Sequence, residues 1–134
     1  MEIVTQISIF MENQPGVLAR ICEALGAQKI QIQGFSIVES SEHGLIRAVV
    51  SDPVRAIHLL GEGGLLVTER DVLSLQVPNR AGAMAEIARL LGRHRINILY
   101  GYGSNVERTR IGQMFLSVSN PERALEVLSA NLEY

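Results

Sequence analysis

The chain of 134 residues contains one cysteine, no tryptophan and very little aromatic side chain of any kind. A single cysteine, Cys22, excludes an internal disulfide and any CxxC metal or redox motif. No apolar run approaches the ~18 residues that a membrane-spanning helix needs. The chain begins MEIVTQISIF, without the basic region that precedes the apolar segment of a signal peptide. We therefore expect a cytoplasmic protein that does not associate with membranes.

The charge balance excludes a further class of function. The formal net charge is −2 and aromatic residues make up 4% of the chain, so neither a basic surface nor a stacking platform for nucleic acid is expected. His43, His58 and His94 fall in separate predicted elements, which argues against a metal site. We expect no cofactor. The composition of the whole chain, 47% apolar and 19% charged residues, is typical of a globular protein.

The sequence repeats itself. Asn13–Ile32 aligns with Asn79–Ile98 at an offset of 79 − 13 = 66, and eight of the twenty positions are identical. Farther on, SDPVRAIHLL (51–60) aligns with SNPERALEVL (119–128) at an offset of 119 − 51 = 68. A repeat this long indicates a duplicated small domain rather than a solenoid. We expect one domain at residues 1–70 and the other at residues 71–134.

Each half has a similar pattern of predicted elements. β-branched and apolar runs predict strands, helical spacing of apolar residues predicts helices, and Asp52-Pro53 and Asn120-Pro121 are helix starts. The predicted elements of the first half are a strand at 4–11, a helix at 15–28, a hairpin of 30–39 and 45–51 with the tip SSEHG, a helix from 53 to about 60, and a strand at 65–69. Those of the second half are a strand at 72–77, a helix at 82–94, a hairpin of 97–103 and 111–119, and a helix from 121.

The order predicts an α+β protein of two ferredoxin-like βαββαβ units packed side by side. Each unit should have strand order 4-1-3-2 with both helices on one face. The second unit has no sequence left for its last strand, which leaves a sheet edge for something else to cover. Glu69-Arg70-Asp71 is the expected linker between the units.

The stretch ENQPGVLARICEALGAQKIQIQGFSI (12–37) resembles the ACT domain, a regulatory module that binds amino acids and controls biosynthetic enzymes. Asn13-Gln14-Pro15-Gly16-Val17-Leu18 fits the first-loop motif, and 29–32 fits the start of strand two. In the second half Asn79-Arg80-Ala81-Gly82 lacks the proline, while 95–98 fits strand two better. The resemblance covers both halves and implies a tandem ACT protein without a catalytic domain.

The loop chemistry also suggests a ligand site on physical grounds. The first amides of a helix are unpaired and favour a carboxylate. Gly16 and Gly82 allow close approach to the backbone, and an asparagine carbonyl can accept from an α-ammonium group. The ACT resemblance implies that the ligand sits where the first loop of one unit meets strand two of another, so that Asn13 faces Asn97 and Asn79 faces Gln31. The implied ligand-binding residues are Asn13, Gln14, Pro15, Gly16, Val17, Leu18, Gln31, Asn79, Arg80, Ala81, Gly82, Ala83, Met84 and Asn97, with the Asn13/Asn97 site the tighter one.

Simpler interpretations stay open for the same residues. Asn13 and Asn79 can be helix caps or turn formers, and Gln31 and Asn97 can be ordinary strand residues. Cys22 is interpreted as a half-buried structural thiol.

For function we favour a non-enzymatic amino-acid sensor that controls its own assembly or a partner enzyme of amino-acid or aryl-acid metabolism, as a homodimer or higher homo-oligomer. The alternatives are a ligand-free interaction module, to which a partner donates the missing strand, and a small enzyme of the acylphosphatase type around Arg80.

Overall fold

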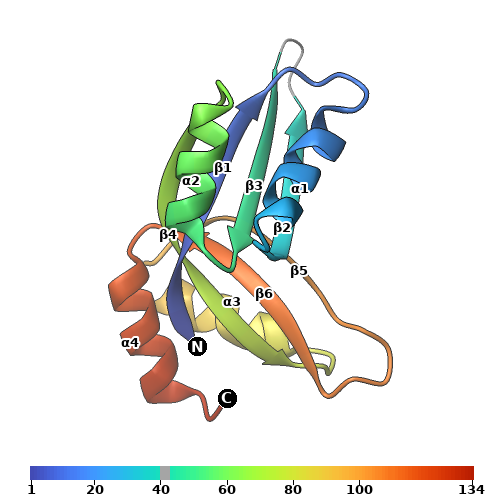
Figure 1. Ribbon diagram of the computed structural model, residues 1–134. Coiled ribbons are helices and arrows are strands. Elements are labelled where there is room, and N and C mark those ends of the chain that lie inside the picture. Colours follow the sequence, from blue (N-terminus) through green and yellow to red (C-terminus); the bar gives the residue numbers. More distant parts are fainter. Residues whose placement is uncertain (40–42) are drawn as a thin grey trace. The chain divides into compact units, whose positions relative to one another are not determined.

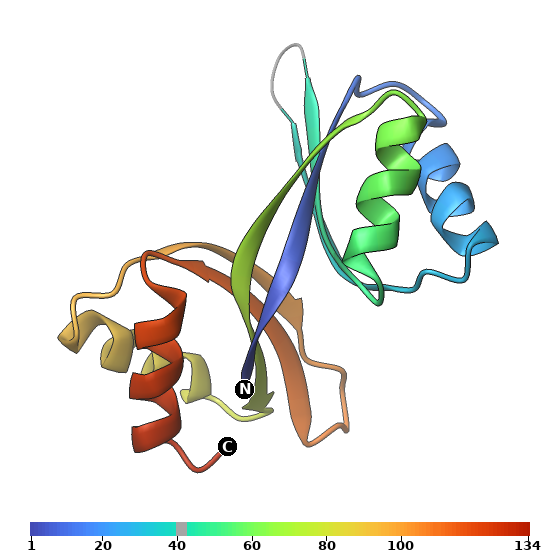
Figure 2. The ribbon, with the colours of Figure 1, turned by 60° about the vertical axis from the view of Figure 1, so that its left-hand side comes forward.

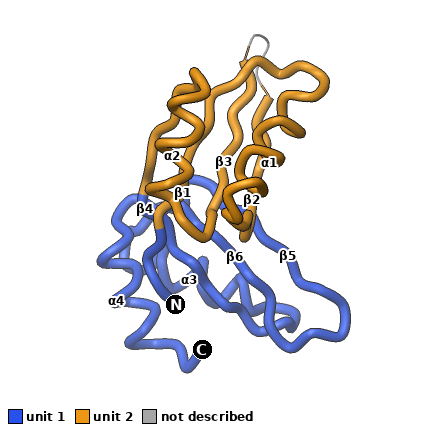
Figure 3. The backbone as a smooth tube through the Cα atoms, in the orientation of Figure 1, with its two compact units in different colours: residues 1–4, 71–134 blue, residues 5–70 orange. Residues whose placement is uncertain are grey.

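The computed structural model describes residues 1–39 and 43–134, so Ser40–Glu42 of the predicted hairpin tip lie outside the described residues. Contacts divide the chain into two units (Figure 3). Unit 2 is Thr5–Arg70, and unit 1 combines Met1–Val4 with Asp71–Tyr134.

Unit 2 is built from six elements (Figure 1). They are β1 (Glu2–Met11), α1 (Val17–Ala27), β2 (Ile32–Glu39), β3 (Gly44–Val50), α2 (Pro53–Glu62) and β4 (Leu66–Pro78), of which β1 and β4 also extend into unit 1. The strand order is β2-β3-β1-β4, and β3 is antiparallel to both β1 and β2. This is the predicted 4-1-3-2 order.

The core of unit 2 lies between its sheet and its two helices, which are neighbours on one face of the sheet (Figure 2). Alternate residues of β1 point into it, and Ile9, which is fully buried, is directly opposite Ile46 of β3. Leu25 of α1 and Leu60 of α2 close the core from the other side. The period-2 and period-3.6 patterns of the sequence therefore meet in one apolar layer.

Unit 1 repeats the arrangement with β4, α3 (Ala83–Arg93), β5 (Ile98–Ser104), β6 (Ile111–Val118) and α4 (Pro121–Asn131). Its strand order is β1-β4-β6-β5, and β6 is antiparallel to β4 and β5. Leu75, Ile87 and Leu128 are completely buried in its core. Within the described residues no strand follows α4, as the sequence predicts.

The place of the missing strand in unit 1 is taken by the start of β1. Strand β1 begins at Glu2 rather than at the predicted Val4, and it is hydrogen-bonded to β4. Met1 and Ile3 pack against the core of unit 1. The sheet edge that the sequence analysis left for something else to cover is thus occupied by residues 1–4 of the same chain.

The predicted linker is wrong. Glu69-Arg70-Asp71 lies in the middle of β4, which continues from Leu66 to Pro78 as one strand. The two strands predicted at 65–69 and 72–77 are thus a single element. Both long strands, β1 and β4, contribute residues to each unit.

The outer strands β2 and β5 each have one partner, β3 and β6 respectively. Both carry a register irregularity near their start, between Ile32 and Gly34 in β2 and between Ile98 and Tyr100 in β5. The irregularity in β5 lies just before Gly101 and Gly103. These two glycines allow close approach of β6.

Candidate functional site

The Asn13 loop (residues 12–16) ends in a glycine that caps the helix. Helix α1 begins at Val17 rather than at the predicted Pro15, and Gly16 is its N-cap with φ 87°. Gln14 donates its amide to the Glu12 carbonyl at 2.9 Å, and the amide of Val17 donates to the Gln14 carbonyl at 3.2 Å. No side chain caps the helix, so the interpretation of Asn13 as a cap is wrong.

Several polar groups of this loop and of the first turn of α1 form no hydrogen bond within the described residues. Across residues 1–39 and 43–134, the amides of Gly16, Leu18 and Ala19 and the side chain of Asn13 have no hydrogen-bond partner. Asn13 and Gly16 are exposed. The loop therefore presents donors at a helix N-terminus and one free carboxamide, the groups that a carboxylate and an ammonium require.

Two predicted side-chain contacts of the ligand belong to the cores instead. Val17 is buried in the core of unit 2 and Ala83 in that of unit 1. Leu18 and Met84 are half-buried and pack against the same cores. Because Leu18 and Met84 are partly exposed, they are the predicted apolar contacts that a ligand beside the loops can still reach.

The Asn79 loop (residues 78–82) has the same backbone but different side-chain contacts. Gly82 caps α3 with φ 90°. The Asn79 carboxamide donates to the carbonyls of Val106, at 3.2 Å, and Thr109, at 2.9 Å. The Asn79 amide donates to the carbonyl of Arg110 at 2.8 Å. Asn79 thus connects the start of α3 to the β5–β6 loop.

Arg80 belongs to a small polar group that the sequence analysis missed. Its Nη2 lies 2.8 Å from Oε2 of Glu86, and the Tyr134 hydroxyl donates to the same oxygen at 3.0 Å. These hydrogen bonds hold the pKa of Glu86 below its usual 4.5. We call Arg80, Glu86 and Tyr134 the Glu86 cluster. Arg80 is therefore engaged by a carboxylate and does not form the anion cradle that an acylphosphatase requires.

Gln31 and Asn97 lie just before β2 and β5. The Gln31 amide donates to Oγ of Ser51, and the Asn97 amide donates to Oγ of Ser119, both at 2.9 Å. Both residues are exposed. Within its own unit, each lies beyond the C-terminal end of an 11-residue helix whose N-terminus carries the loop, a separation of about 16 Å. No single unit brings a loop and a strand start together.

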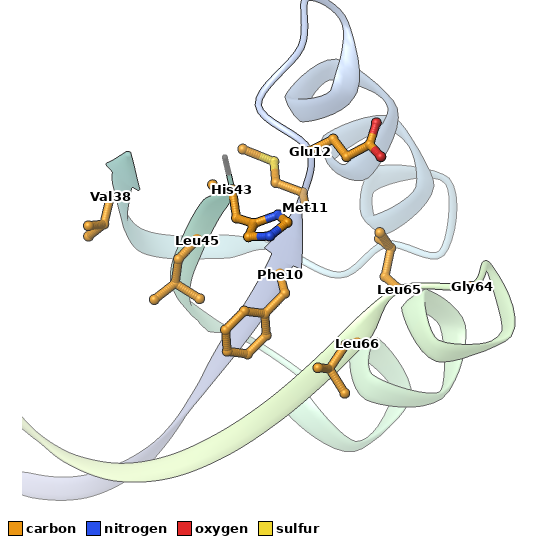
Figure 4. A pocket seen from close by; sticks show the side chains of 10 residues that line it. Phe10, Met11, Glu12, Val38, His43, Leu45, Gly64, Leu65 and Leu66 are labelled. Carbon is orange, nitrogen blue, oxygen red and sulfur yellow. The ribbon is translucent and has the colours of Figure 1, made fainter. Parts of the chain in front are cut away.

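Unit 2 also contains a pocket of about 670 Å³ beside the Asn13 loop (Figure 4). Phe10, Val38, Leu45 and Leu66, one from each strand, line it together with His43. Of the predicted site residues it includes none. The repeat places polar residues at the equivalents of three of these apolar positions, namely Gln76, Ser104 and Gln113.

Neither a cluster of metal-ligating side chains nor a helix long and apolar enough to cross a membrane occurs in the described part of the chain.

Two units of duplicated sequence, one βαββαβ and one βαββα completed by the start of β1, define a tandem ferredoxin-like protein. Each has a glycine-capped helix after its first strand. A family model for the ACT domain pair matches residues 1–134. The chain belongs to this family, which confirms the resemblance seen in its loop motifs.

Solved structures agree with this assignment. A crystal structure of a protein from Bacteroides thetaiotaomicron is 30% identical, with a TM-score of 0.89 over 96% of this chain and 88% of that one. The regulatory subunit of aspartate kinase from Thermus thermophilus, in its ligand-free form, has 17% identity and a TM-score of 0.70 over 99% of both chains. The corresponding subunit from Thermus flavus has 16% identity and a TM-score of 0.63, over 97% and 96%. The last two likenesses concern the fold. A search of curated proteins finds no match.

Proposed function

We propose that this protein is a non-catalytic regulator that binds a free amino acid at the Asn13 loop and thereby controls a partner enzyme. The observation that carries the proposal is the set of unpaired groups in this loop and the first turn of α1, namely the amides of Gly16, Leu18 and Ala19 and the carboxamide of Asn13. The amides suit an α-carboxylate and the carboxamide oxygen suits an α-ammonium. Membership of the ACT domain pair family and the regulatory subunits among its structural neighbours support a regulatory role.

A second copy of the chain completes the proposed site. Strand β2 is an edge strand, and its Phe35 and Ile37 are 51% and 42% exposed. Strand β5 is also an edge strand, with Asn97 just before it. Pairing of β2 with β5 of a second copy would satisfy both edges and bring Asn97 toward Asn13. The ligand would then favour the dimer by its differential affinity for the two states.

A thermal-shift screen of the twenty amino acids against the whole protein tests this function. An amino acid that binds, present at 100 times its Kd, is expected to raise the Tm on the order of 10 °C. Asn13→Ala removes most of the shift, because it deletes the carboxamide. The variant Asn105→Ala changes an exposed asparagine outside the Asn13 and Asn79 loops, and it keeps the shift.

The same screen separates the two remaining functions. If no amino acid shifts the Tm and light scattering finds the same dimer with and without amino acids, the protein is a ligand-free interaction module. A ligand-dependent shift that Asn13→Ala leaves intact would place binding elsewhere.

A further inference from the structure

The helices of unit 2 border a second, smaller pocket. It has a volume of about 290 Å³ and lies between α1 and the end of α2. Most of its lining is apolar, with Ile21 and Ala24 on one side and Leu59 and Leu65 on the other. Residues 12–16 of the Asn13 loop do not line it. The pocket is therefore distinct from the site proposed above.

In unit 1 a tyrosine lies at the equivalent place. Tyr134 follows α4, which ends at Asn131, and it packs against the core of unit 1. Its hydroxyl donates to Oε2 of Glu86 in α3 at 3.0 Å. The repeat aligns Glu86 with Arg20 (86 − 20 = 66) and Asn131 with Gly63 (131 − 63 = 68), and both Arg20 and Gly63 line the pocket. Tyr134 thus connects the two elements whose counterparts border the pocket in unit 2.

A second side chain differs in size between the two units. Ala24 of α1 aligns with Leu90 of α3, because 90 − 24 = 66. Both residues are half-buried, and Leu90 packs against the core of unit 1. Unit 1 therefore has a leucine and a tyrosine ring where unit 2 has an alanine and an open pocket.

The volume of the pocket suits a single aromatic ring. An apolar cavity of about 150 Å³ is large enough for benzene. The pocket of about 290 Å³ therefore holds one ring with a short polar substituent.

Arg20 determines which substituent fits. Among the described residues it is the one charged side chain that lines the pocket, whereas Glu23 and Glu62, which are close to lining residues in the sequence, do not line it. The guanidinium of Arg20 has neither an ion-pair nor a hydrogen-bond partner in the described part of the chain. A guanidinium has donors only, and its strongest hydrogen bonds are those to a carboxylate.

We infer that unit 2 binds a monocyclic aromatic carboxylate between α1 and α2, with its carboxylate on Arg20 and its ring in the place that Tyr134 takes in unit 1. An aromatic ring then lies between the two helices of each unit. In unit 1 the ring belongs to the chain and its hydroxyl donates to a carboxylate. In unit 2 the ring belongs to a ligand, and the ligand supplies the carboxylate. This site does not depend on the proposed function.

Titration of the isotope-labelled full chain with benzoate and 3-phenylpropanoate, followed by NMR of the methyl groups, tests the inference. Saturable shifts are expected at Ile21, Leu59 and Leu65, which line the pocket. Benzamide and 3-phenylpropanamide have the ring without the charge, and they are expected to bind about tenfold more weakly because the charge-assisted hydrogen bond to Arg20 is lost.

Two variants locate the site. Ala24→Leu places the leucine of unit 1 in the pocket and is expected to abolish the shifts. Its matched control is Ala27→Leu, because Ala27 is an exposed alanine of the same helix that does not line the pocket, and this variant is expected to keep them. Arg20→Gln is expected to bind acids and amides equally, and it serves if Ala24→Leu does not fold.

The outcomes separate this inference from the proposed function. The inference is overturned if no saturable shift occurs at the three methyl positions, if binding survives in folded Ala24→Leu, or if wild type binds acids and amides equally. Asn13→Ala is expected to leave the shifts unchanged, and their loss would place the acid at the Asn13 loop instead. A protein that binds these acids but no amino acid would contradict the proposed function alone.

Discussion

Asn13 and Asn79 show how one residue type acquires two uses after a duplication. Each follows a strand and precedes a glycine-capped helix. Asn79 faces a loop whose carbonyls lie within hydrogen-bond reach, and it donates to two of them. Asn13 has no such partner in the described chain. The surroundings, not the residue, decide whether the carboxamide is structural or available.

The Glu86 cluster makes the stability of the folded protein depend on pH, once in the acidic range and once in the alkaline range. Glu86 has a pKa below 4.5, because Arg80 and Tyr134 donate to its carboxylate. Its contribution to stability is therefore present above pH 4.5 and is lost as the pH falls through the folded pKa. Burial and the hydrogen bond to Glu86 raise the pKa of Tyr134 above 10. The contribution of Tyr134 to stability is therefore present below pH 10 and is lost as the pH rises through the pKa of Tyr134 in the folded protein.

We predict that Tyr134→Phe raises the pKa of the Glu86 carboxyl toward 4.5 but not fully to it, because Arg80 still donates. An NMR titration of the Glu86 carboxyl carbon measures this directly. The control is Arg80→Gln, which removes the largest cause of the lowered pKa and is expected to raise the pKa further. Equal pKa values in wild type and Tyr134→Phe would contradict the assigned hydrogen bond.

Sequence reasoning could identify the loop positions but not all of their contacts. Every helix start has free amides, so the sequence could predict free amides near Gly16 and Gly82, which precede the two helices. The partners of Asn79 are backbone carbonyls 27 and 30 residues away, and a backbone carbonyl has no sequence signature. Glu86 did leave a signal, because the repeat aligns it with Arg20, and a charge reversal at an aligned position could have been noticed.

At the scale of single elements, the β5–β6 pair depends on glycine for its close packing. A Cβ on Gly103 would meet the carbonyl of Gln113 and lie 2.8 Å from Cα of Met114. Backbone cannot move aside as a flexible side chain can. By contrast, Gly92 of α3 has nothing within 4 Å of an added Cβ. Two glycines in one unit therefore predict opposite effects.

Gly103→Ala is expected to lower the free energy of unfolding by about 1–3 kcal/mol, the usual cost of overpacking. Gly92→Ala is its matched control and should raise it by roughly 0.5–1 kcal/mol, because alanine is the better helix former. Urea denaturation of both variants measures the two values. A neutral Gly103→Ala would mean that β5 can shift away from β6.

Helices and strands were largely predictable because their apolar periods are clear, whereas helix starts were less so. The pairs Asp52-Pro53 and Asn120-Pro121 mark the starts of α2 and α4 correctly, and both caps accept from the helix backbone at 3.1 Å. Pro15 gave a false start for α1, because the chain makes a turn through Pro15 and Gly16 before the helix begins at Val17.

At the scale of the whole molecule, the two long strands β1 and β4 are shared between the two repeated units. Thr68–Asp71 of β4 is exposed at every position, so it has no apolar alternation and resembles a linker in sequence. It is nevertheless part of β4, a strand that is hydrogen-bonded to β1. Pairing between backbones is independent of side chains, which is why this region could not be predicted. The domain ranges 1–70 and 71–134 stay a proposal about the duplicated sequence.

Removing Glu2–Val4 is expected to destabilise unit 1 more than unit 2. The deletion takes away Ile3, which packs against the unit 1 core, and the backbone partner of β4. Hydrogen exchange followed by mass spectrometry should show faster exchange in α3 and α4, with α1 and α2 less affected. Ile3→Val, which keeps the strand, is the control. Faster exchange confined to α1 and α2 would contradict the assignment of Met1–Val4 to unit 1.

The start of β1 also fixes an order of events during synthesis. The ribosome makes Glu2–Val4 before the residues of unit 2, and the remainder of their own unit, residues 71–134, after them. Unit 2 has all of its residues once Arg70 has emerged, while the first few residues still lack their partners. Domains generally fold from the N-terminus during translation, but unit 1 needs residues made both before and after unit 2. It can close only after residues 71–134 have been made, when unit 2 has long had all of its own residues.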